Sequence, residues 1–159
     1  MPFPAVLAMG DLLTNSKALR DYLILETYEA GIALRGTEVK SLRGGKGQLA
    51  DSFARVEDHQ VWLYNFHIDE YAHGNLHNHN PKAKRRLLLH ASEIRKLFGL
   101  ASVKGHTLVP LSCYWKGNRL KIRLGVGKGK VEYDKRQDLR QREADRDIQR
   151  ATAKQLRGR

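Results

Sequence analysis

Residues 119–126 alternate strictly between apolar and polar side chains, and this pattern limits the chain to folds that contain a half-buried strand. Leucine, isoleucine or valine occupies every even position, and Arg119, Lys121 and Arg123 occupy three successive odd positions. Because successive side chains of a strand point to opposite faces of its sheet, one face of this strand belongs to a core. Its other face is basic.

Two segments nearer the N-terminus predict further strands. Residues 22–34 place apolar side chains on one side, broken only by Glu26, and Gly31 marks a bend in this long strand. Phe53–Glu57 and residues 61–68 are rich in β-forming residues and are separated by a short polar turn. We expect these last two segments to form a hairpin.

A second hairpin is expected to lead into the alternating strand. Residues 107–115 reach it through the turn Lys116-Gly117-Asn118, whose composition is typical of hairpin loops. Pro110 lies inside this partner strand and has no backbone N–H to donate, so it marks an edge or a bulge.

Two short helices interrupt the strands. Thr37 is positioned to cap residues 38–43, and Ser92 is positioned to cap residues 93–98, which end before Gly105. About five or six strands with few helices and Gly-rich corners predict a mainly β fold that closes into a small barrel. The oligonucleotide-binding barrel is the natural candidate, by analogy of fold.

The charge balance favours a polyanionic partner. The chain has 29 Lys and Arg against 17 Asp and Glu, a net charge of +12, which favours nucleic acid. A membrane surface would require a basic helix with a bulky apolar face, and we find no such segment. Cys113 is the only cysteine, so we expect a buried thiol rather than a nucleophile, and a reducing, cytoplasmic setting.

The composition changes after Gly127. Eleven Lys or Arg and six Asp or Glu follow, with few large aliphatic residues and no proline. Such a tail has too little apolar surface to pack firmly, so we expect it to be disordered alone and helical on RNA, with the helix opening at Asp134. We hypothesise that Met9 is the true start, or that the leader is dispensable. The predicted domains are a disordered leader (1–14), an RNA-binding β-barrel (15–127) and a basic C-terminal tail (128–159).

Three separated stretches of this sequence resemble one protein family. The first comprises residues 15–18, 21–22, 28–31 and 36–43; the second, residues 85–90 and 108–111; the third, residues 127–130 and 134–136 with Arg140, Arg142 and Glu143. Together and in this order they resemble the small protein B family, also called the SsrA-binding proteins, which are bacterial partners of transfer-messenger RNA (tmRNA).

The resemblance implies an adaptor that acts in trans-translation. The barrel is expected to hold the tRNA-like domain of tmRNA, and the tail is expected to enter the empty mRNA channel and the small-subunit decoding site of a stalled ribosome. Elongation factor Tu with GTP would deliver the complex, and the trapped peptide would be tagged. No nucleophile with its base, paired carboxylates or phosphate-binding loop stands out in the sequence, so we expect no catalytic residue, cofactor or metal. We expect a monomer when the protein is free.

The resemblance and the charge pattern together give the candidate contacts. Glu29 would accept hydrogen bonds from base edges or a ribose hydroxyl, or else be a solvated strand residue. Leu88 and His90 would face RNA, although a Leu run of this kind is also typical of a core. The candidates on the barrel are Asn15, Lys17, Glu29, Lys40, Arg43, Lys84, Arg85, Arg86, Leu88 and His90. Those on the tail are Lys128, Lys130, Tyr133, Asp134, Lys135, Arg136, Arg140 and Arg142.

Several alternatives remain open at this stage. The cations after Pro81 could be a solvated charge run in a loop, and the tail could serve only solubility. His73, His77 and His79 suggest a metal site, but their spacing is not that of a zinc motif, so a polar loop is the preferred interpretation. A structural ribosomal or general RNA-binding protein, or an RNA-cleaving enzyme that uses these histidines, are the competing functions.

Overall fold

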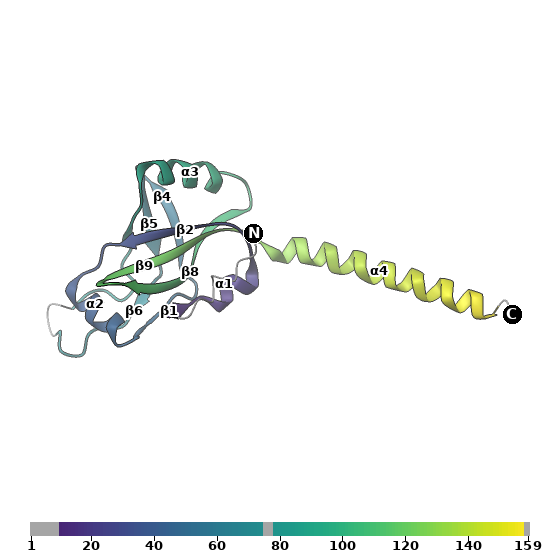
Figure 1. The fold of residues 1–159 in the computed structure, drawn as a ribbon, viewed down its shortest axis with the longest axis horizontal. Coiled ribbons are helices and arrows are strands. Elements are labelled where there is room, and N and C mark those ends of the chain that lie inside the picture. Colours follow the sequence, from purple (N-terminus) through teal and green to yellow (C-terminus); the bar gives the residue numbers. More distant parts are fainter. Residues whose placement is uncertain (1–9, 75–77, 158–159) are drawn as a thin grey trace. The chain divides into compact units, whose positions relative to one another are not determined.

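The computed structural model of the chain describes residues 10–74 and 78–157, without the side chains of residues 131–139 and 155–157. The chain divides into two compact units, Met1–Lys128 and Gly129–Arg159. The first unit contains the sheets and three short helices, and the second contains one long helix (Figure 1). No helix in the described part of the chain is both long and apolar enough to cross a membrane.

Six strands of the first unit form a closed ring. The main sheet has the order β1-β8-β4-β5-β7-β2-β9, and β9 also pairs with β8, which closes the ring and leaves β1 outside it. The strands of the main sheet are β1 (Asp11–Thr14), β2 (Tyr22–Ile32), β4 (Phe53–Glu57), β5 (Gln60–Tyr64), β7 (Arg85–Leu88), β8 (His106–Lys116) and β9 (Arg119–Gly129).

The remaining elements are short, apart from the last helix. Strands β3 (Gly47–Gln48) and β6 (His67–Ile68) pair with each other in a separate small sheet. The helices are α1 (Ser16–Asp21), α2 (Gly36–Arg43), α3 (Ala91–Ala101) and α4 (Lys130–Arg157). The mainly β character expected from the sequence is confirmed.

The alternation predicted for residues 119–126 is confirmed. Leu120, Ile122, Leu124 and Val126 are at most 4% exposed and belong to the core inside the ring, whereas Arg119 is exposed. Strand β8 differs, because its residues Leu108–Cys113 are all buried. Val109 and Leu111 of this strand belong to a second, smaller apolar cluster with Ala18 and Ile24.

Two glycines of β9 allow close approach to its neighbours in the ring, Gly125 to β8 and Gly127 to β2. A Cβ atom added at Gly125 would lie 2.9 Å from Cδ1 of Leu111, and one added at Gly127 would lie 3.0 Å from Cβ of Tyr22. Both distances are shorter than a normal van der Waals contact between carbon atoms. Glycine at these two positions lets the strands approach each other.

Both predicted hairpins are present. Glu57 pairs with Gln60 across the two-residue loop Asp58-His59, whose φ angles of 48° and 63° are those of a tight hairpin turn. The second hairpin joins β8 to β9, and its register shifts between Pro110 and Ser112, which confirms the predicted bulge. The strand expected over residues 61–68 is interrupted, because Asn65 has a φ of 60° and turns the chain away from the sheet after Tyr64.

The predicted leader is shorter than expected. Asp11–Thr14 forms β1, which pairs with β8, and Leu12 and Leu13 pack against the core. Backbone pairing and apolar burial order this segment, so the disordered leader predicted over 1–14 is wrong for 11–14. Residues 1–9 lie outside the described residues.

Both predicted helix starts are displaced by two residues. The residue before α2 is Arg35, whose backbone N–H donates to Oε1 of Glu38 at 2.8 Å, and the residue before α3 is His90, whose N–H donates to Oε1 of Glu93 at 3.2 Å. A carboxylate three residues into each helix satisfies a free backbone donor there. Thr37 and Ser92 are therefore inside their helices and do not cap them.

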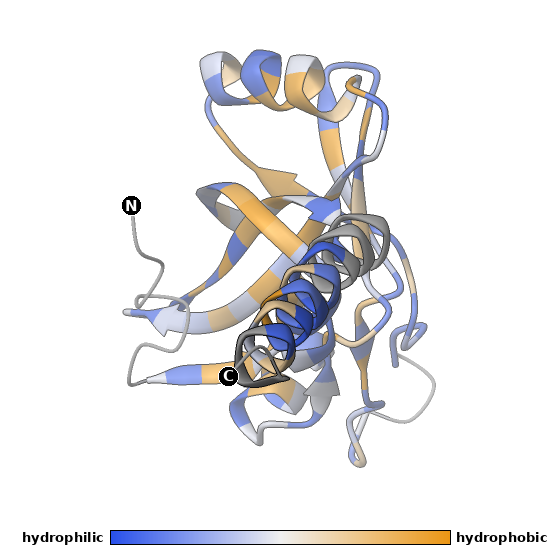
Figure 2. Cartoon of the chain, turned by 90° about the vertical axis from the view of Figure 1, so that its right-hand side faces the viewer, coloured by the Kyte–Doolittle hydropathy of each residue, from blue (hydrophilic) through white to orange (hydrophobic). Residues whose placement is uncertain are grey.

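Helix α4 occupies most of the second unit. Its backbone is helical from Lys130, four residues before the start predicted at Asp134. The side chains of residues 140–154 are all exposed, and hydrophilic residues predominate among them (Figure 2).

Candidate nucleic-acid interface

Glu29 lies on the outer face of β2 within a hydrogen-bonded group. Its carboxylate accepts hydrogen bonds from the Tyr114 hydroxyl at 2.5 Å and from Nζ of Lys116 at 3.2 Å. The hydrogen bond from Tyr114 is the main cause of a lowered pKa for Glu29. Burial and then this same bond raise the pKa of Tyr114 to about 12. The Glu29 carboxylate is therefore an ionised acceptor held in a fixed position.

Leu88 and His90 lie beside Glu29 at one end of β7. Gly31 of β2 pairs with Leu88 of β7. Because the two strands are antiparallel, Glu29, two residues before Gly31, and His90, two residues after Leu88, lie on the same side of this pair. Leu88 is 47% exposed whereas Leu87 is fully buried, and His90 is exposed. Leu88 and His90 therefore face outward. We call Glu29, Leu88, His90, Tyr114 and Lys116 the Glu29 patch.

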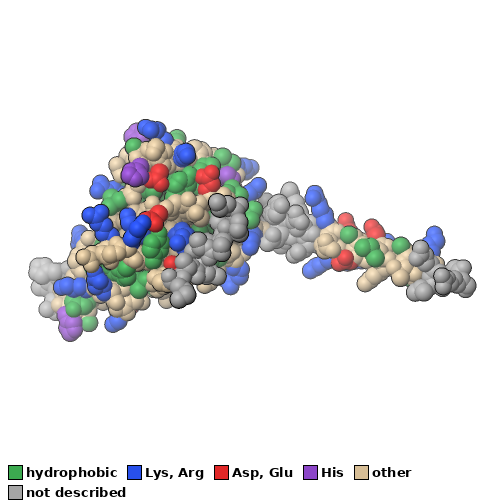
Figure 3. All heavy atoms as spheres, in the orientation of Figure 1, with side chains coloured by type: hydrophobic (Ala, Val, Ile, Leu, Met, Phe, Trp, Pro, Cys, Tyr) green, Lys and Arg blue, Asp and Glu red, His purple; other side chains and the backbone are tan. Residues whose placement is uncertain are grey.

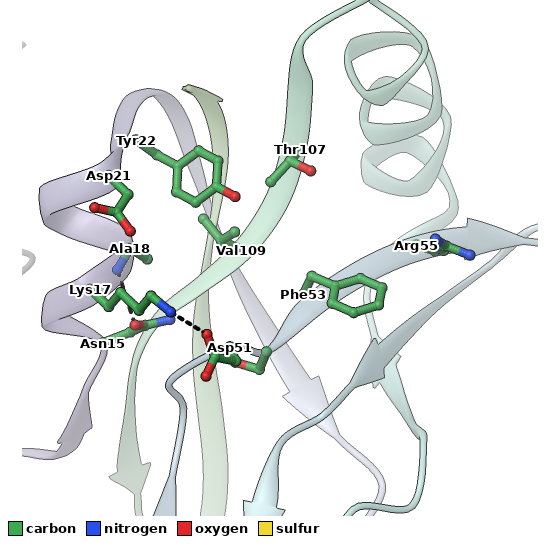
Figure 4. Close-up of a pocket in the computed structure, with 11 residues that line it drawn as sticks. Asn15, Lys17, Ala18, Asp21, Tyr22, Asp51, Phe53, Arg55, Thr107 and Val109 are labelled. Carbon is green, nitrogen blue, oxygen red and sulfur yellow. Dashed lines mark hydrogen bonds and ion pairs between the residues drawn. The ribbon is translucent and has the colours of Figure 1, made fainter. Parts of the chain in front are cut away.

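Asn15 and Lys17 border a hollow beside α1 (Figure 4). Oδ1 of Asn15 accepts the Ala18 N–H at 3.1 Å, and Nδ2 donates to the carbonyls of Leu49 at 3.1 Å and Pro110 at 2.9 Å. The amide of Asn15 is thus buried and used within the fold, contrary to the RNA contact expected of it. Lys17 is exposed and pairs with Asp51 at 2.5 Å.

Arg85 does not face solvent, which corrects its predicted phosphate contact. It is 4% exposed, and its Nε donates to the carboxylate of Glu38. Its other guanidinium nitrogens donate to backbone carbonyls of Phe66, Asn80 and Pro81. The sequence predicts a loop of cations that leads into a strand, but residue 85 already belongs to β7 and points inward.

The neighbours of Arg85 do face outward, as predicted. Lys84 and Arg86 are exposed, and Nζ of Lys84 lies 4.5 Å from the ring centroid of Trp62. On α2, Lys40 and Arg43 are also exposed. Nζ of Lys40 lies 5.4 Å from the ring of Tyr71, and Cζ of Arg43 lies 4.6 Å from the ring of Trp115. Lys and Arg side chains outnumber acidic ones on the face seen in Figure 3.

His79 and Cys113 are both buried within the fold. His79 is 3% exposed; its Nε2 donates to the Ile68 carbonyl at 2.9 Å, which leaves Nδ1 to accept from the Thr37 hydroxyl at 2.9 Å. His77 lies outside the described residues, among which no group of three or more His, Cys, Asp or Glu could hold a metal ion. Cys113 is fully buried, as predicted, and burial raises its pKa to about 12.

The candidates on the tail belong to the end of β9 and to α4. Lys128 is exposed, Lys130 is half-buried, and Arg140 and Arg142 are exposed. Tyr133, Asp134, Lys135 and Arg136 have helical backbone, and their side chains lie outside the described part of the chain.

Sequence reasoning missed Tyr114 and Lys116 as partners of Glu29. They are 85 and 87 residues away from it in the chain, so no local pattern links them. It also did not identify the aromatic side chains on the outer face of β4 and β5. The two-residue alternation within that hairpin could have predicted that they face outward.

Comparison with known proteins identifies the family. The sequence profile described as SmpB protein matches residues 12–154. The chain belongs to the SmpB family. The SsrA-binding protein of Carboxydothermus hydrogenoformans is 58% identical over 137 residues, which are 86% of this chain and 92% of that relative. The SsrA-binding protein of Frankia casuarinae is 50% identical over 145 residues, which are 91% of each chain.

A solved structure supports this assignment to the SmpB family. It is called "tmRNA-SmpB: a journey to the center of the bacterial ribosome". A chain in it superposes on this one with a TM-score of 0.64 and 52% sequence identity, over 74% of this chain and 83% of the other. Over that part, the chain shares its fold and about half of its residues with the solved structure.

Proposed function

We propose that this chain is an adaptor that binds tmRNA and acts with it on stalled ribosomes in trans-translation. The observation that carries the proposal is the Glu29 patch of an SmpB-family chain. There a fixed carboxylate acceptor lies beside an exposed leucine and an exposed histidine. An acceptor can recognise base edges and ribose hydroxyls, while Leu88 and His90 can pack on a ribose or a base.

The first unit is proposed to bind the tRNA-like domain of tmRNA. We interpret its closed ring of six strands as an oligonucleotide-binding-type barrel. The exposed cations around the ring would contact phosphates. Asn15 and Arg85 are excluded because their polar atoms are used within the fold. The proposed contacts are Lys17, Glu29, Lys40, Arg43, Lys84, Arg86, Leu88 and His90.

The tail is proposed to enter the empty mRNA channel and the decoding site. Helix α4 exposes every described side chain from residue 140 to residue 154, so little apolar burial supports it there. We infer that the tail is disordered in the free protein and becomes helical on the ribosome. Its proposed contacts are Lys128, Lys130, Tyr133, Asp134, Lys135, Arg136, Arg140 and Arg142.

The remaining features of the proposal concern partners and setting. Elongation factor Tu is the proposed partner during delivery, and the free protein is proposed to be a cytoplasmic monomer. The proposal assigns the protein no catalytic step, cofactor or metal.

A reconstituted translation system can test the two roles separately. Deleting residues 134–159 is expected to leave the affinity for isolated tmRNA within about twofold and to abolish peptide tagging, because the tail acts on the ribosome. Glu29→Ala and His90→Ala are expected to weaken tmRNA binding itself, by roughly tenfold for loss of a charge-assisted hydrogen bond or a stacked ring. An equal loss of tmRNA affinity on deleting the tail would contradict this division.

A further inference from the structure

The outer face of the β4–β5 hairpin carries a row of three aromatic rings. Phe53 of β4 pairs with Tyr64 of β5, and their rings are stacked with centroids 5.3 Å apart and planes at 10°. Trp62 lies two residues before Tyr64 on the same strand and therefore on the same face. All three side chains are half-buried, so part of each apolar ring is accessible.

Cations lie over and beside these rings. Cζ of Arg55 is 5.3 Å from the centroid of Phe53 and 5.9 Å from that of Tyr64. Nζ of Lys84 is 4.5 Å from the centroid of Trp62 and 6.0 Å from that of Tyr64. Arg86, which pairs with Trp62, is also exposed. We call Phe53, Arg55, Trp62, Tyr64, Lys84 and Arg86 the aromatic strip.

One carboxylate holds part of this arrangement in place. Oε1 of Glu57 accepts the Tyr64 hydroxyl at 2.5 Å, and its Oε2 lies 3.9 Å from Nζ of Lys84. Glu57 therefore fixes one ring and one cation of the aromatic strip. The arrangement places rings and cations on the same surface, and the carboxylate of Glu57 is engaged with both.

The aromatic strip lies between two hollows of the surface. One, of about 550 Å³, is bordered by Phe53 and Arg55 together with Tyr22, Thr107 and Val109 (Figure 4). The other, of about 430 Å³, is lined by residues that include Leu34, Arg35, Trp62, Lys84 and Arg86. Each hollow thus has an aromatic wall and at least one Arg or Lys at its border.

We propose that the aromatic strip is a second RNA-binding site, which takes unpaired nucleotides. Bases would stack on Trp62 and on the Phe53–Tyr64 pair, and phosphates would contact Arg55, Lys84 and Arg86. Flat rings on a sheet bind the faces of bases, which a duplex hides and a single strand exposes. The site shares no residue with the Glu29 patch, but its Lys84 and Arg86 are also among the contacts proposed for the tRNA-like domain. It rests on the proposed function in that the ligand is RNA and in these two cations.

Fluorescence of Trp62 tests the site directly. The chain has two tryptophans, so Trp115→Phe leaves Trp62 as the only reporter in the otherwise complete chain. Titration with an unstructured RNA of about twelve nucleotides, within the range of known single-strand sites, is expected to quench this fluorescence. A perfect duplex of the same length is expected to leave it unchanged. Binding of the single strand without quenching would overturn the proposal.

Affinity measurements give the matched comparison. Trp62→Ala is expected to weaken binding of the single strand by roughly tenfold, and Trp62→Phe is expected to retain most of the affinity. Phe98→Ala removes another aromatic side chain, 61% exposed on α3, and is expected to change nothing. If Trp62→Ala behaves like Phe98→Ala, the aromatic strip is not a binding site. Binding of complete tmRNA by Glu29→Ala should be measured in the same series. Weaker binding there, with unchanged binding by Trp62→Ala, would mean that the proposed function holds and only the aromatic strip fails.

Discussion

Arg85 and Glu38 form an ion pair inside the first unit, with side-chain exposures of 3% and 5%. The pair joins β7 to α2 and is completed by backbone carbonyls that accept from the guanidinium. Desolvation makes such a pair costly to break, because the remaining partner is left charged and unpaired in the interior.

Arg85→Met is therefore expected to destabilise the protein by about 3–5 kcal/mol, since it leaves the Glu38 carboxylate buried without its partner. Chemical denaturation monitored by circular dichroism measures the change. Arg86→Met, one residue along the same strand but exposed, is the control and should stay within about 0.5 kcal/mol of the wild type. A similar loss in both variants would contradict the interior role of Arg85.

Gly127→Ala is expected to cost about 1–3 kcal/mol, because the new methyl group would meet Cβ of Tyr22 at 3.0 Å where β9 approaches β2. A methyl group added at Gly99 on α3 would have nothing within 4 Å. Gly99→Ala should consequently stabilise the protein by about 0.5–1 kcal/mol, through helix propensity alone. Thermal unfolding of the two variants should thus shift in opposite directions.

Tyr114→Phe is expected to raise the pKa of Glu29 towards its ordinary value of 4.5, since the hydroxyl is the main cause of the lowered pKa. Titration of the Glu29 carboxyl carbon by NMR measures this. A lowered pKa in the folded state contributes stability above pH 4.5 that is lost as the pH falls through the folded value. The stability difference between wild type and Tyr114→Phe should therefore shrink in acid, and a constant difference would count against the hydrogen bond.

Asn15→Ala is expected to destabilise the protein by about 1–2 kcal/mol, because it removes the N-cap of α1 and the two hydrogen bonds to Leu49 and Pro110. Lys17→Ala, two residues away and exposed, should leave stability within about 0.5 kcal/mol. Denaturation and tmRNA binding should be measured on both variants. Unchanged stability of Asn15→Ala would return its amide to the candidate RNA contacts.

Sequence reasoning succeeded where the signal is local. The alternation of residues 119–126 and the bulge at Pro110 follow from the two-residue period of a strand or from the chemistry of one residue. These features need no knowledge of distant parts of the chain. The hairpins could be predicted for the same reason.

It failed where a residue's role depends on a distant partner. In the sequence, Arg85 resembles one more cation in a charged run. It is an interior residue because it pairs with Glu38, which is 47 residues away in the chain. Asn15 is a different case, because asparagine before Ser16 is a local capping signal that could have predicted α1. This capping hydrogen bond also explains why the side-chain oxygen of Asn15 is used within the fold.

Strand β7 alternates between Arg85 and Leu87 on the inside and Arg86 and Leu88 on the outside. Deleting one residue within this strand would exchange the two sets, moving a guanidinium out of its ion pair and the outer side chains into the core. A single register of β7 therefore determines both which of its side chains fill the interior and which face the proposed binding surface. A substitution within β7 leaves the two sets on their own sides, whereas an insertion or deletion of one residue there does not.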